Sequence, residues 1–443
     1  METKNNFFKM SSKFVFKRHG EDFYFIDITD SLNNRFIVGK GAEKVLFPLL
    51  KGKSKEDVAL SVGVDEKLIE EYASLLIKEK ILKSSSCSVS SSNRCFKIFP
   101  SIDTLDVMIT NKCNLSCPHC FPDSGKIHYD EVDIKVWIDV FKQAKKLGVF
   151  GLNISGGEPF LSKKLYKILE YLQSENYFQV NLNTNGTIPI DSYLKIISKT
   201  ISLVQVSLDG NTKNHDFFRG QKGSFDKAVC TIKKLLSYGI EVGVAFSLGA
   251  NNLNQLDEVV SVCKDLGVKH LSIGFIKSAG RSLCNNLAIN SISLSKDKFI
   301  DKMLSKFLIL KRLKGLEISF PFDFSGEKNE LITPESLICG GNIIQSMAIT
   351  PNGNTTPCGM LLSKEFFCGN IKDYKIEDIW LSEKMRSFRL FPLKKVPGCC
   401  DCDKIQYCGK PCLVQMFSTD NNLELPDTGR CLITEKIISL VNK

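Results

Sequence analysis

The residues with the clearest chemical potential are cysteines, which gather in two groups. One group follows the spacing C-x3-C-x2-C in the segment TNKCNLSCPHCF and comprises Cys113, Cys117 and Cys120. In the other, five cysteines fall within fourteen residues near the C-terminus: Cys399, Cys400, Cys402, Cys408 and Cys412. Thiolates so closely spaced are soft donors that suit zinc or iron–sulfur clusters, and a disulfide framework is the competing interpretation.

The composition favours metal ligation over disulfides. The chain has 443 residues and 17 cysteines, and its N-terminus lacks the apolar segment of a signal peptide. No run reaches the ~18 apolar residues that would span a membrane. We therefore expect a cytoplasmic protein of two or three domains whose thiols stay reduced. The net charge of +10 permits an acidic partner without requiring one.

Residues 100–320 alternate between apolar strands and helical patterns. The six predicted strands are 105–110, 151–155, 179–185, 203–209, 241–248 and 270–276. Several of the intervening helices end at a glycine, namely Gly148, Gly239 and Gly267. Repeated strand–helix units predict a parallel sheet that curls toward a barrel. The chemistry then belongs at the C-terminal ends of the strands, where the connecting loops converge.

The loops after the first four strands carry polar or cysteine motifs. The C-x3-C-x2-C motif follows the first strand, and its thiolates can hold three irons of a four-iron cluster. SGGEPF follows the second, where glycines allow close backbone approach and Glu158 can accept from an ammonium. NTNG and SLDG follow the next two and offer Asn185, Ser207 and Asp209 to hydroxyls. Singly, each glycine motif could be turn chemistry, and the cysteines could hold zinc.

Together and in this order, the motifs resemble those of the radical S-adenosylmethionine superfamily over about residues 100 to 280. The resemblance implies a four-iron four-sulfur cluster on Cys113, Cys117 and Cys120, whose open iron chelates the amino and carboxylate groups of S-adenosylmethionine. It also implies a set of cofactor contacts. These are Phe121 and Ile273 for the adenine, Gly156, Gly157, Glu158 and Pro159 for the methionyl amine, Asn185 and Ser207 for the ribose, and Arg219 for the carboxylate.

The C-terminal cysteines resemble the SPASM extension of radical S-adenosylmethionine enzymes that modify peptides and proteins. The spacing is C-x13-G-x4-C from Cys339, followed by the cysteine-rich segment and, after 18 intervening residues, a last cysteine, Cys431. The resemblance implies two auxiliary four-iron clusters. One would take Cys399, Cys402, Cys408 and Cys431, and the other Cys339, Cys358 and Cys412. Cys400 or Cys368 completes the second set, or its iron is open to a substrate cysteine, which is our hypothesis.

Residues 13–83 predict a small winged-helix-like domain. Three strands (13–18, 23–28 and 35–39) precede three helices (41–52, 54–63 and 65–82). Ser54 and Asp65 are expected helix N-caps. The last helix should bury one stripe, made of Leu68, Ile69, Tyr72, Leu75 and Leu76. A serine-rich linker, 84–99, follows.

The charge of this domain argues against DNA binding. Residues 1–83 hold 15 Lys and Arg against 13 Asp and Glu, and residues 65–80 have five acids against three bases. A helix with that balance would be repelled by phosphates. Peptide binding at an exposed strand edge fits better.

Segments such as FRGQKGSFDKAVCTIKKLLSYGI and CGGNIIQSMAITPNGNTTPCGMLLSKEFFCGNI are most similar to those of sactipeptide maturases, which link a cysteine sulfur to an α-carbon of a ribosomally made peptide. We therefore expect an α/β fold: a partial (β/α)6 barrel at 100–320, the N-terminal domain and a SPASM domain at 321–443. The resemblance implies hydrogen abstraction by a 5′-deoxyadenosyl radical. It also implies a precursor peptide whose leader binds the N-terminal domain, and a flavodoxin or ferredoxin as electron donor. No nucleic acid partner is expected.

Other activities remain open at this stage. The same combination of domains could form thioethers to β- or γ-carbons, carbon–carbon crosslinks or epimers. Anaerobic sulfatase maturases are disfavoured, because they place an aspartate where Gly359 follows Cys358. A metal-stabilised winged-helix regulator without turnover is a further alternative. The glycine and asparagine motifs speak against it, since a structural cluster needs no cofactor pocket.

Overall fold

The computed structural model divides the chain into two compact units, Met1–Ser101 and Ile102–Lys443. Each unit is described by itself. The residues that the structure describes are 7–10, 14–19, 22–27, 35–37, 42–50, 53–78, 82–85, 102–125, 130–249, 252–277, 279–282, 296–322, 327, 346–408, 412–414, 416 and 428–441. Cys339 and most of the serine-rich linker lie outside them.

The first unit contains the three strands and three helices that the sequence predicts. They are β2 (Phe14–His19), β3 (Asp22–Asp27), β4 (Arg35–Ile37), α1 (Ala42–Leu50), α2 (Lys55–Val62) and α3 (Glu66–Lys78). The three strands form an antiparallel sheet. A second antiparallel pair, β1 (Phe7–Met10) with β5 (Leu82–Ser85), was not predicted. The predicted cap is present at Ser54, whose hydroxyl accepts from the Asp57 amide.

The buried stripe of α3 is narrower than predicted. Ile69, Ala73 and Leu76 are buried in the core of this unit. Leu68 and Leu75 were expected in the same stripe, but they are 55% and 52% exposed. The prediction for these two leucines is wrong, because the helix turns one side only toward α1 and α2 and leaves their positions outside that contact.

The second unit is built on a ten-stranded sheet whose order is β12-β11-β10-β9-β8-β7-β6-β13-β14-β15. The six predicted strands are its centre and pair in parallel in chain order. They are β6 (Thr104–Met108), β7 (Gly151–Ser155), β8 (Gln179–Thr184), β9 (Leu203–Ser207), β10 (Val242–Leu248) and β11 (His270–Phe275). This confirms the α/β class with a parallel sheet.

Both edges of this sheet carry strands that the sequence did not reveal. β12 (Glu317–Ser319) pairs in parallel with β11. On the other side, β13 (Ser346–Ile349) pairs in parallel with β6, and β14 (Asn354–Thr356) and β15 (Gly369–Asn370) continue antiparallel. The C-terminal cysteine-rich region therefore shares a main-chain ladder with the barrel strands.

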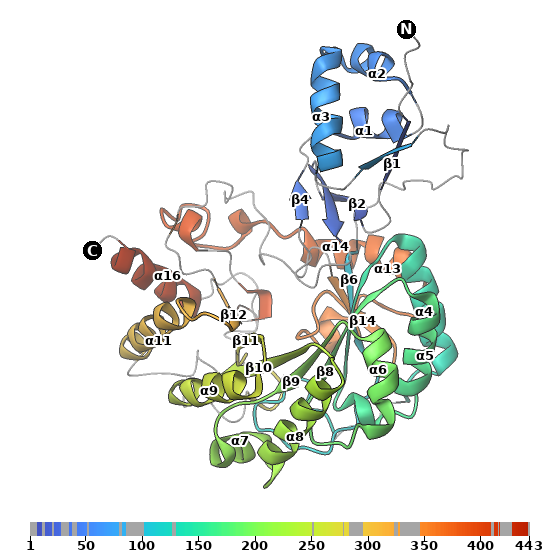
Figure 1. The fold of residues 1–443 in the computed structure, drawn as a ribbon. Helices are drawn as coiled ribbons and strands as arrows, with labels where there is room; N and C mark the ends of the chain where they lie inside the picture. The colour runs from blue at the N-terminus through green and yellow to red at the C-terminus, as the bar shows by residue number, and fades with distance from the viewer. Residues whose placement is uncertain are drawn as a thin grey trace. The chain divides into compact units, whose positions relative to one another are not determined.

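Helices cover the outer face of the curved sheet (Figure 1). They are α4 (Ile134–Leu147), α5 (Leu165–Glu175), α6 (Leu194–Thr200), α8 (Ser224–Ser237), α9 (Leu256–Leu266) and α11 (Lys296–Lys311), whereas α7 (Thr212–Arg219) lies beside the cysteine loop. The C-terminal region adds α13 (Ile376–Leu381), α14 (Glu383–Arg389) and α16 (Thr428–Val441). As predicted, α4 and α9 end at Gly148 and Gly267, which take the left-handed conformation that glycine favours.

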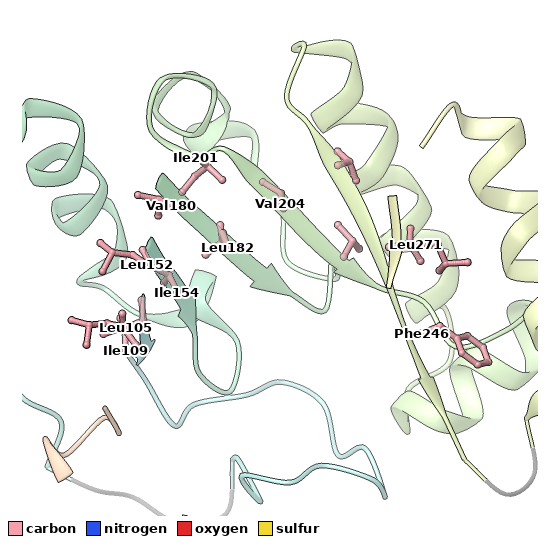
Figure 2. Packing of buried hydrophobic residues seen from close by; sticks show 14 of the residues in the cluster. Leu105, Ile109, Leu152, Ile154, Val180, Leu182, Ile201, Val204, Phe246 and Leu271 are labelled. Atoms are coloured by element: carbon pink, nitrogen blue, oxygen red, sulfur yellow. The ribbon is translucent and has the colours of Figure 1, made fainter. Parts of the chain in front are cut away.

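The two faces of the sheet differ in chemistry. Alternate residues such as Leu152, Ile154 and Leu182 are fully buried and form the hydrophobic core with the helices (Figure 2). The residues between them point inward and are polar. Asp106, Asn153 and Asn181 occupy one row across β6, β7 and β8, because successive strand residues face opposite sides.

We predict that Phe141→Ala lowers the free energy of unfolding by about 3–5 kcal/mol, because a buried aromatic leaves a cavity. Phe141 is fully buried, and its ring lies 6.3 Å from the rings of Trp137, Tyr171 and Phe178. Chemical denaturation measures the change. The control is Tyr374→Ala, since Tyr374 is 60% exposed and should cost less than about 0.5 kcal/mol. Equal losses in the two variants would contradict the core assignment.

Candidate functional site

The three cysteines of the first motif lie together on the loop after β6. Cys117 is buried, whereas Cys113 and Cys120 are partly buried. Burial raises the pKa of the Cys113 thiol to about 11, and the neighbouring Cys117 and Cys120 thiols raise it further in the same direction. Their mutual electrostatic effect shows that the three sulfurs are near neighbours, as three ligands of one cluster must be.

A segment after β11 holds this loop from the far side of the barrel. The Arg281 guanidinium donates to the Cys117 carbonyl at 2.8 Å and to Asp123 at 2.6 Å, and the Arg281 amide donates to the Cys120 carbonyl at 3.0 Å. Gly280 packs so closely that an added Cβ would collide with the Phe121 carbonyl. Sequence reasoning missed both residues, since nothing local to Gly280 and Arg281 points to a loop 160 residues earlier.

The two glycines of GGEP pack against the same loop. A Cβ on Gly156 would lie 2.5 Å from the Thr110 carbonyl, and one on Gly157 would collide with the Lys112 carbonyl. The Gly157 amide donates to Thr110 and the Glu158 amide to Lys112, at 2.8 and 2.7 Å. We expected these glycines to admit a bound molecule, and the structure shows that they also admit the cysteine loop itself.

Glu158 is fully buried between the loops after β7 and β8. Its carboxylate accepts from the amide of Phe160, the hydroxyl of Thr184 and the amide of Asn185, at 3.2, 2.9 and 2.8 Å. Burial raises the pKa of Glu158 to about 7, although these hydrogen bonds oppose the shift. The predicted contact with the methionyl amine stays a prediction, and so does that of Pro159, which begins the short helix after Glu158.

Asn185 ties the β8 loop to the cysteine loop. Its side-chain oxygen accepts from Thr187, and its amide nitrogen donates to Asn114 at 3.1 Å. Asn114 also donates to the Thr187 hydroxyl. Asn185 therefore lies beside the predicted cluster, at the C-terminal end of its strand, where a ribose contact was predicted.

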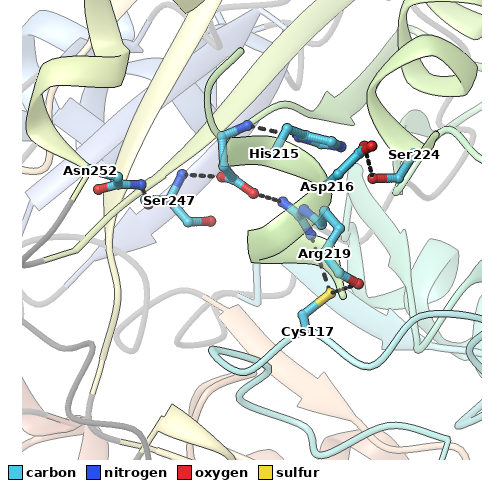
Figure 3. Close-up of polar contacts among 8 residues, drawn as sticks. Cys117, His215, Asp216, Arg219, Ser224, Ser247 and Asn252 are labelled. Carbon is cyan, nitrogen blue, oxygen red and sulfur yellow. Dashed lines mark hydrogen bonds and ion pairs between the residues drawn. The ribbon is translucent and has the colours of Figure 1, made fainter. Parts of the chain in front are cut away.

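Arg219 and Asp209 form a buried ion pair beside Cys117 (Figure 3). The guanidinium lies 2.6 Å from the Asp209 carboxylate and 4.0 Å from the Cys117 sulfur. Burial works against charge on both groups, but their attraction outweighs it. It holds the pKa of Asp209 below and that of Arg219 above the usual value. The predicted contacts of both side chains with S-adenosylmethionine stay predictions.

The adenine and ribose predictions fall on opposite faces of the sheet. Ser207 shares its row with Ala245, and Ser272 continues that row on β11. Ile273 is the next residue on β11, so its side chain faces the other way and lies 98% buried in the helix-covered core. The Ile273 side chain therefore lies on the face opposite to that of Ser207, and its predicted adenine contact stays a prediction.

A cavity of about 660 Å³ opens beside the cysteine loop. Its walls come from the loop itself, from the ends of β6 and β7, and from the C-terminal region, and all of these belong to the second unit. Its lining residues include Met108, Phe121, Gly156, Gly280, Met360, Leu361 and Phe367. The volume lies within the range of small-molecule and cofactor sites. Two predicted cofactor contacts, Phe121 and Gly156, are thus on its wall.

The C-terminal cysteines show a second gathering of thiols. Cys399 is partly buried, which raises its pKa to about 11, and Cys408, Cys402 and Cys400 raise it further as neighbours. Cys358, Cys399 and Cys412 pack against one small hydrophobic cluster, and Cys431 is exposed on α16. Of the two spare thiols, Cys400 is exposed and donates to Asp401, whereas Cys368 donates to the Phe366 carbonyl at 3.3 Å.

Two features are absent from the described residues: a compact metal-ion site and a membrane-spanning helix. No three Cys, His, Asp or Glu side chains among them converge as tightly as one metal ion requires. The ligands of a four-iron cluster are further apart, since each thiolate binds a different iron. Within the same residues, no helix combines the length and hydropathy that crossing a bilayer requires.

The sequence matches two known families. Residues 107–266 match the radical SAM superfamily, and residues 339–403 match the iron–sulfur cluster-binding SPASM domain. The chain therefore contains a radical SAM domain and a SPASM domain. The radical SAM domain makes the protein an enzyme, and the two domains imply S-adenosylmethionine and iron–sulfur clusters as its cofactors.

Two Bacillus subtilis (strain 168) proteins are among the similar radical SAM relatives. The sporulation killing factor maturation protein SkfB is 34% identical over 177 residues, which are 40% of this chain and 43% of SkfB. The antilisterial bacteriocin subtilosin biosynthesis protein AlbA is 30% identical over 279 residues, 62% of this chain and 58% of AlbA. The chain thus spans about half the length of these relatives.

Among solved structures, the fold is similar to that of Streptococcus suis SuiB bound to precursor peptide SuiA. The two share a TM-score of 0.69 and 16% identity, and the match covers 96% of this chain and 99% of SuiB. At this identity the likeness shows the fold alone. It nevertheless extends beyond the radical SAM and SPASM matches to almost the whole chain.

The residues present fit a radical SAM cluster and its cofactor. Three neighbouring thiols lie on a loop whose backbone is fixed on two sides, and the cavity that borders this loop has the volume of a cofactor site. The chemistry of the donors also fits, since partly buried thiolates are the usual ligands of iron–sulfur clusters. These three cysteines are the residues that would hold the cluster.

We predict that Gly280→Ala displaces the cysteine loop and lowers the iron bound after reconstitution, because the added Cβ collides with the Phe121 carbonyl. The φ of +56° at Gly280 also disfavours any residue with a side chain. The matched control is Gly274→Ala on β11, since a Cβ there meets nothing within 4 Å. Iron analysis and the visible absorbance of the cluster are the readouts. Wild-type iron content in Gly280→Ala would show that close packing of Gly280 does not fix the cysteine loop.

We also predict a pH dependence that comes from Glu158. Its pKa of about 7 in the folded chain exceeds the ordinary 4.5, so the folded state holds a proton that the unfolded state releases between these values. Stability contributed by this group is therefore complete below pH 4.5 and falls by about 3 kcal/mol as the pH rises to 7. Urea denaturation of the cluster-free chain across this range should show this fall relative to Glu158→Gln. If the free energy of unfolding changed equally with pH in the wild type and in Glu158→Gln, the prediction would be refuted.

Proposed function

We propose that the protein modifies a ribosomally synthesised precursor peptide and forms thioether crosslinks between a cysteine sulfur and an α-carbon. The observation that carries this proposal is the cavity between the cysteine loop and the C-terminal segment that follows Cys358. One wall is the cysteine loop of the barrel, and the other includes Met360 and Leu361, close behind Cys358. A substrate in this cavity would lie between two metal-binding regions, one that starts radical chemistry and one that can accept an electron.

Cys113, Cys117 and Cys120 would hold the radical SAM cluster. When bound there, reduced cluster and S-adenosylmethionine together supply a 5′-deoxyadenosyl radical that abstracts hydrogen from carbon. The chain's own contribution is to fix the loop, through Arg281 and Gly157, and to shield the cavity from water. Dry, preorganised surroundings suit radical chemistry because they exclude competing reactions.

The C-terminal cysteines would hold two auxiliary four-iron clusters. Cys399, Cys402 and Cys408 are neighbours in the structure, and Cys431 is proposed to complete their set. Cys339, Cys358 and Cys412 are proposed for the second cluster, with an iron left for the substrate's cysteine. The hydrogen bond of Cys368 to the Phe366 carbonyl supports leaving that thiol out.

The partners follow from this activity. The leader of the precursor peptide would bind the N-terminal unit, whose small antiparallel sheet offers strand edges. A flavodoxin or ferredoxin would supply electrons in the cytoplasm. The names of SkfB and AlbA, a maturation protein and a bacteriocin biosynthesis protein, support a peptide product.

The test is anaerobic reconstitution with S-adenosylmethionine, a reductant and the cysteine-bearing peptide encoded beside this gene. We expect roughly 12 iron atoms per chain and a peptide that loses two hydrogens for each bridge while its thiols disappear. Cys117→Ala is the control and should abolish the mass loss.

Three outcomes would contradict the proposal. Unchanged mass with inverted chirality would indicate epimerisation, and mass loss with all thiols still free would indicate a carbon–carbon crosslink. An iron content near four per chain, which is one cluster, would refute the auxiliary clusters.

A further inference from the structure

Asp106 is an inward-facing carboxylate in the middle of β6, and the predictions from sequence gave it no role. Its Oδ1 accepts from the Asn153 side chain at 2.7 Å, and Asn153 in turn accepts from Asn181 at 3.1 Å. This chain of amides fixes the orientation of the carboxylate. A satisfied polar row inside a barrel orients its members more strictly than a single pair would.

The second oxygen of Asp106 lies near Gly359 of the C-terminal region. A Cβ placed on Gly359 would lie 3.8 Å from Oδ2 and 3.6 Å from the Met108 terminal methyl. Met108 is the next inward-facing residue of β6, and both Met108 and Met360 line the cavity. Asp106 therefore lies just below the cavity floor, under the glycine that separates Cys358 from Met360.

The surroundings of Asp106 make its carboxylate a stronger base than an exposed aspartate. Burial raises the pKa of its carboxyl, and the Asn153 hydrogen bond only partly opposes this. Yet the side chain keeps some accessible surface, which in this enclosed position faces the interior of the barrel. A carboxylate with one fixed oxygen and one accessible oxygen, at a raised pKa, is suited to accept a proton.

The other described carboxylates near the cavity are less suited. Both oxygens of Glu158 are occupied by protein donors, and Asp209 is paired with Arg219. Glu365 also lines the cavity, but it is exposed, and a hydrogen bond from Ser363 lowers its pKa. The neighbouring inward-facing residues on β7 and β8 are amides, which do not titrate.

Building on the proposed function, we propose that Asp106 is the general base that accepts the thiol proton of the substrate cysteine as the thioether forms. In this step one carbon–sulfur bond forms, and an S–H and a C–H bond break. The C–H hydrogen leaves as an atom to the cofactor-derived radical, and the thiol proton passes to Oδ2 of Asp106. The remaining electron reduces an iron–sulfur cluster of the C-terminal region.

The test uses the reconstituted full-length enzyme with Asp106→Asn, which keeps the shape and removes the base. We expect 5′-deoxyadenosine formation, and deuterium transfer to it from an α-deuterated peptide, to stay within about twofold of wild type. Thioether formation should fall by about 100-fold or more, the usual contribution of a general base. The matched control is Asp191→Asn, the same change at an exposed ion pair with Lys234, and it should react as wild type.

A second variant distinguishes loss of the carboxylate from a folding defect. Asp106→Glu keeps a carboxylate but displaces it, so it should recover part of the thioether activity lost in Asp106→Asn. Iron content and cluster absorbance should match wild type in both variants.

The outcomes separate this inference from the proposed function. Wild-type thioether formation by Asp106→Asn overturns only the inference, as does loss of thioether in Glu365→Gln with Asp106→Asn unaffected. A parallel loss of 5′-deoxyadenosine and thioether in Asp106→Asn also overturns it, since that marks a structural role. A wild-type enzyme that makes no thioether overturns the proposed function, and this inference with it.

Discussion

Close main-chain packing around the cysteine loop is the constraint on which the site depends. The loop's carbonyls at Thr110, Lys112 and Phe121 lie so near to Gly156, Gly157 and Gly280 that no side chain fits between. Amides from the GGEP loop and from Arg281 donate to these or neighbouring carbonyls. The sulfurs are thus placed by hydrogen-bonded backbone from two other strands, which holds their spacing before any iron is bound.

Around that loop, the buried carboxylates of Glu158 and Asp209 have partners within the protein. Both carboxylate oxygens of Glu158 accept hydrogen bonds from neighbouring loops, and Arg219 and Asp209 neutralise each other beside Cys117. Burying a charge without such partners would cost several kcal/mol. The site is therefore preorganised, and the accessible oxygen of Asp106 differs from this pattern of occupied groups.

Much of the fold followed from periodicity in the sequence. The six barrel strands, their order and the glycine helix ends at Gly148 and Gly267 were predictable, because each depends on residues that are close together in the sequence. The cysteine gatherings were also predictable, because their members are close along the chain. Contacts between distant segments were not: Arg281 reaches back about 160 residues, and β13 joins β6 across more than 200. The predicted burial of Leu68 and Leu75 was wrong, because apolar type alone does not say which neighbour covers a face.

The pairing of β13 with β6 has a mechanical consequence. β6 lies between β7 and β13, so one strand is bonded on one side to the barrel and on the other to the cysteine-rich region. Main-chain ladders open only when a whole cooperative unit unfolds. The loop that follows β6 and the C-terminal segment that follows β13 therefore start from two strand ends that main-chain hydrogen bonds hold side by side. A substrate must therefore follow the path that the loop after β6 and the segment after β13 leave between them.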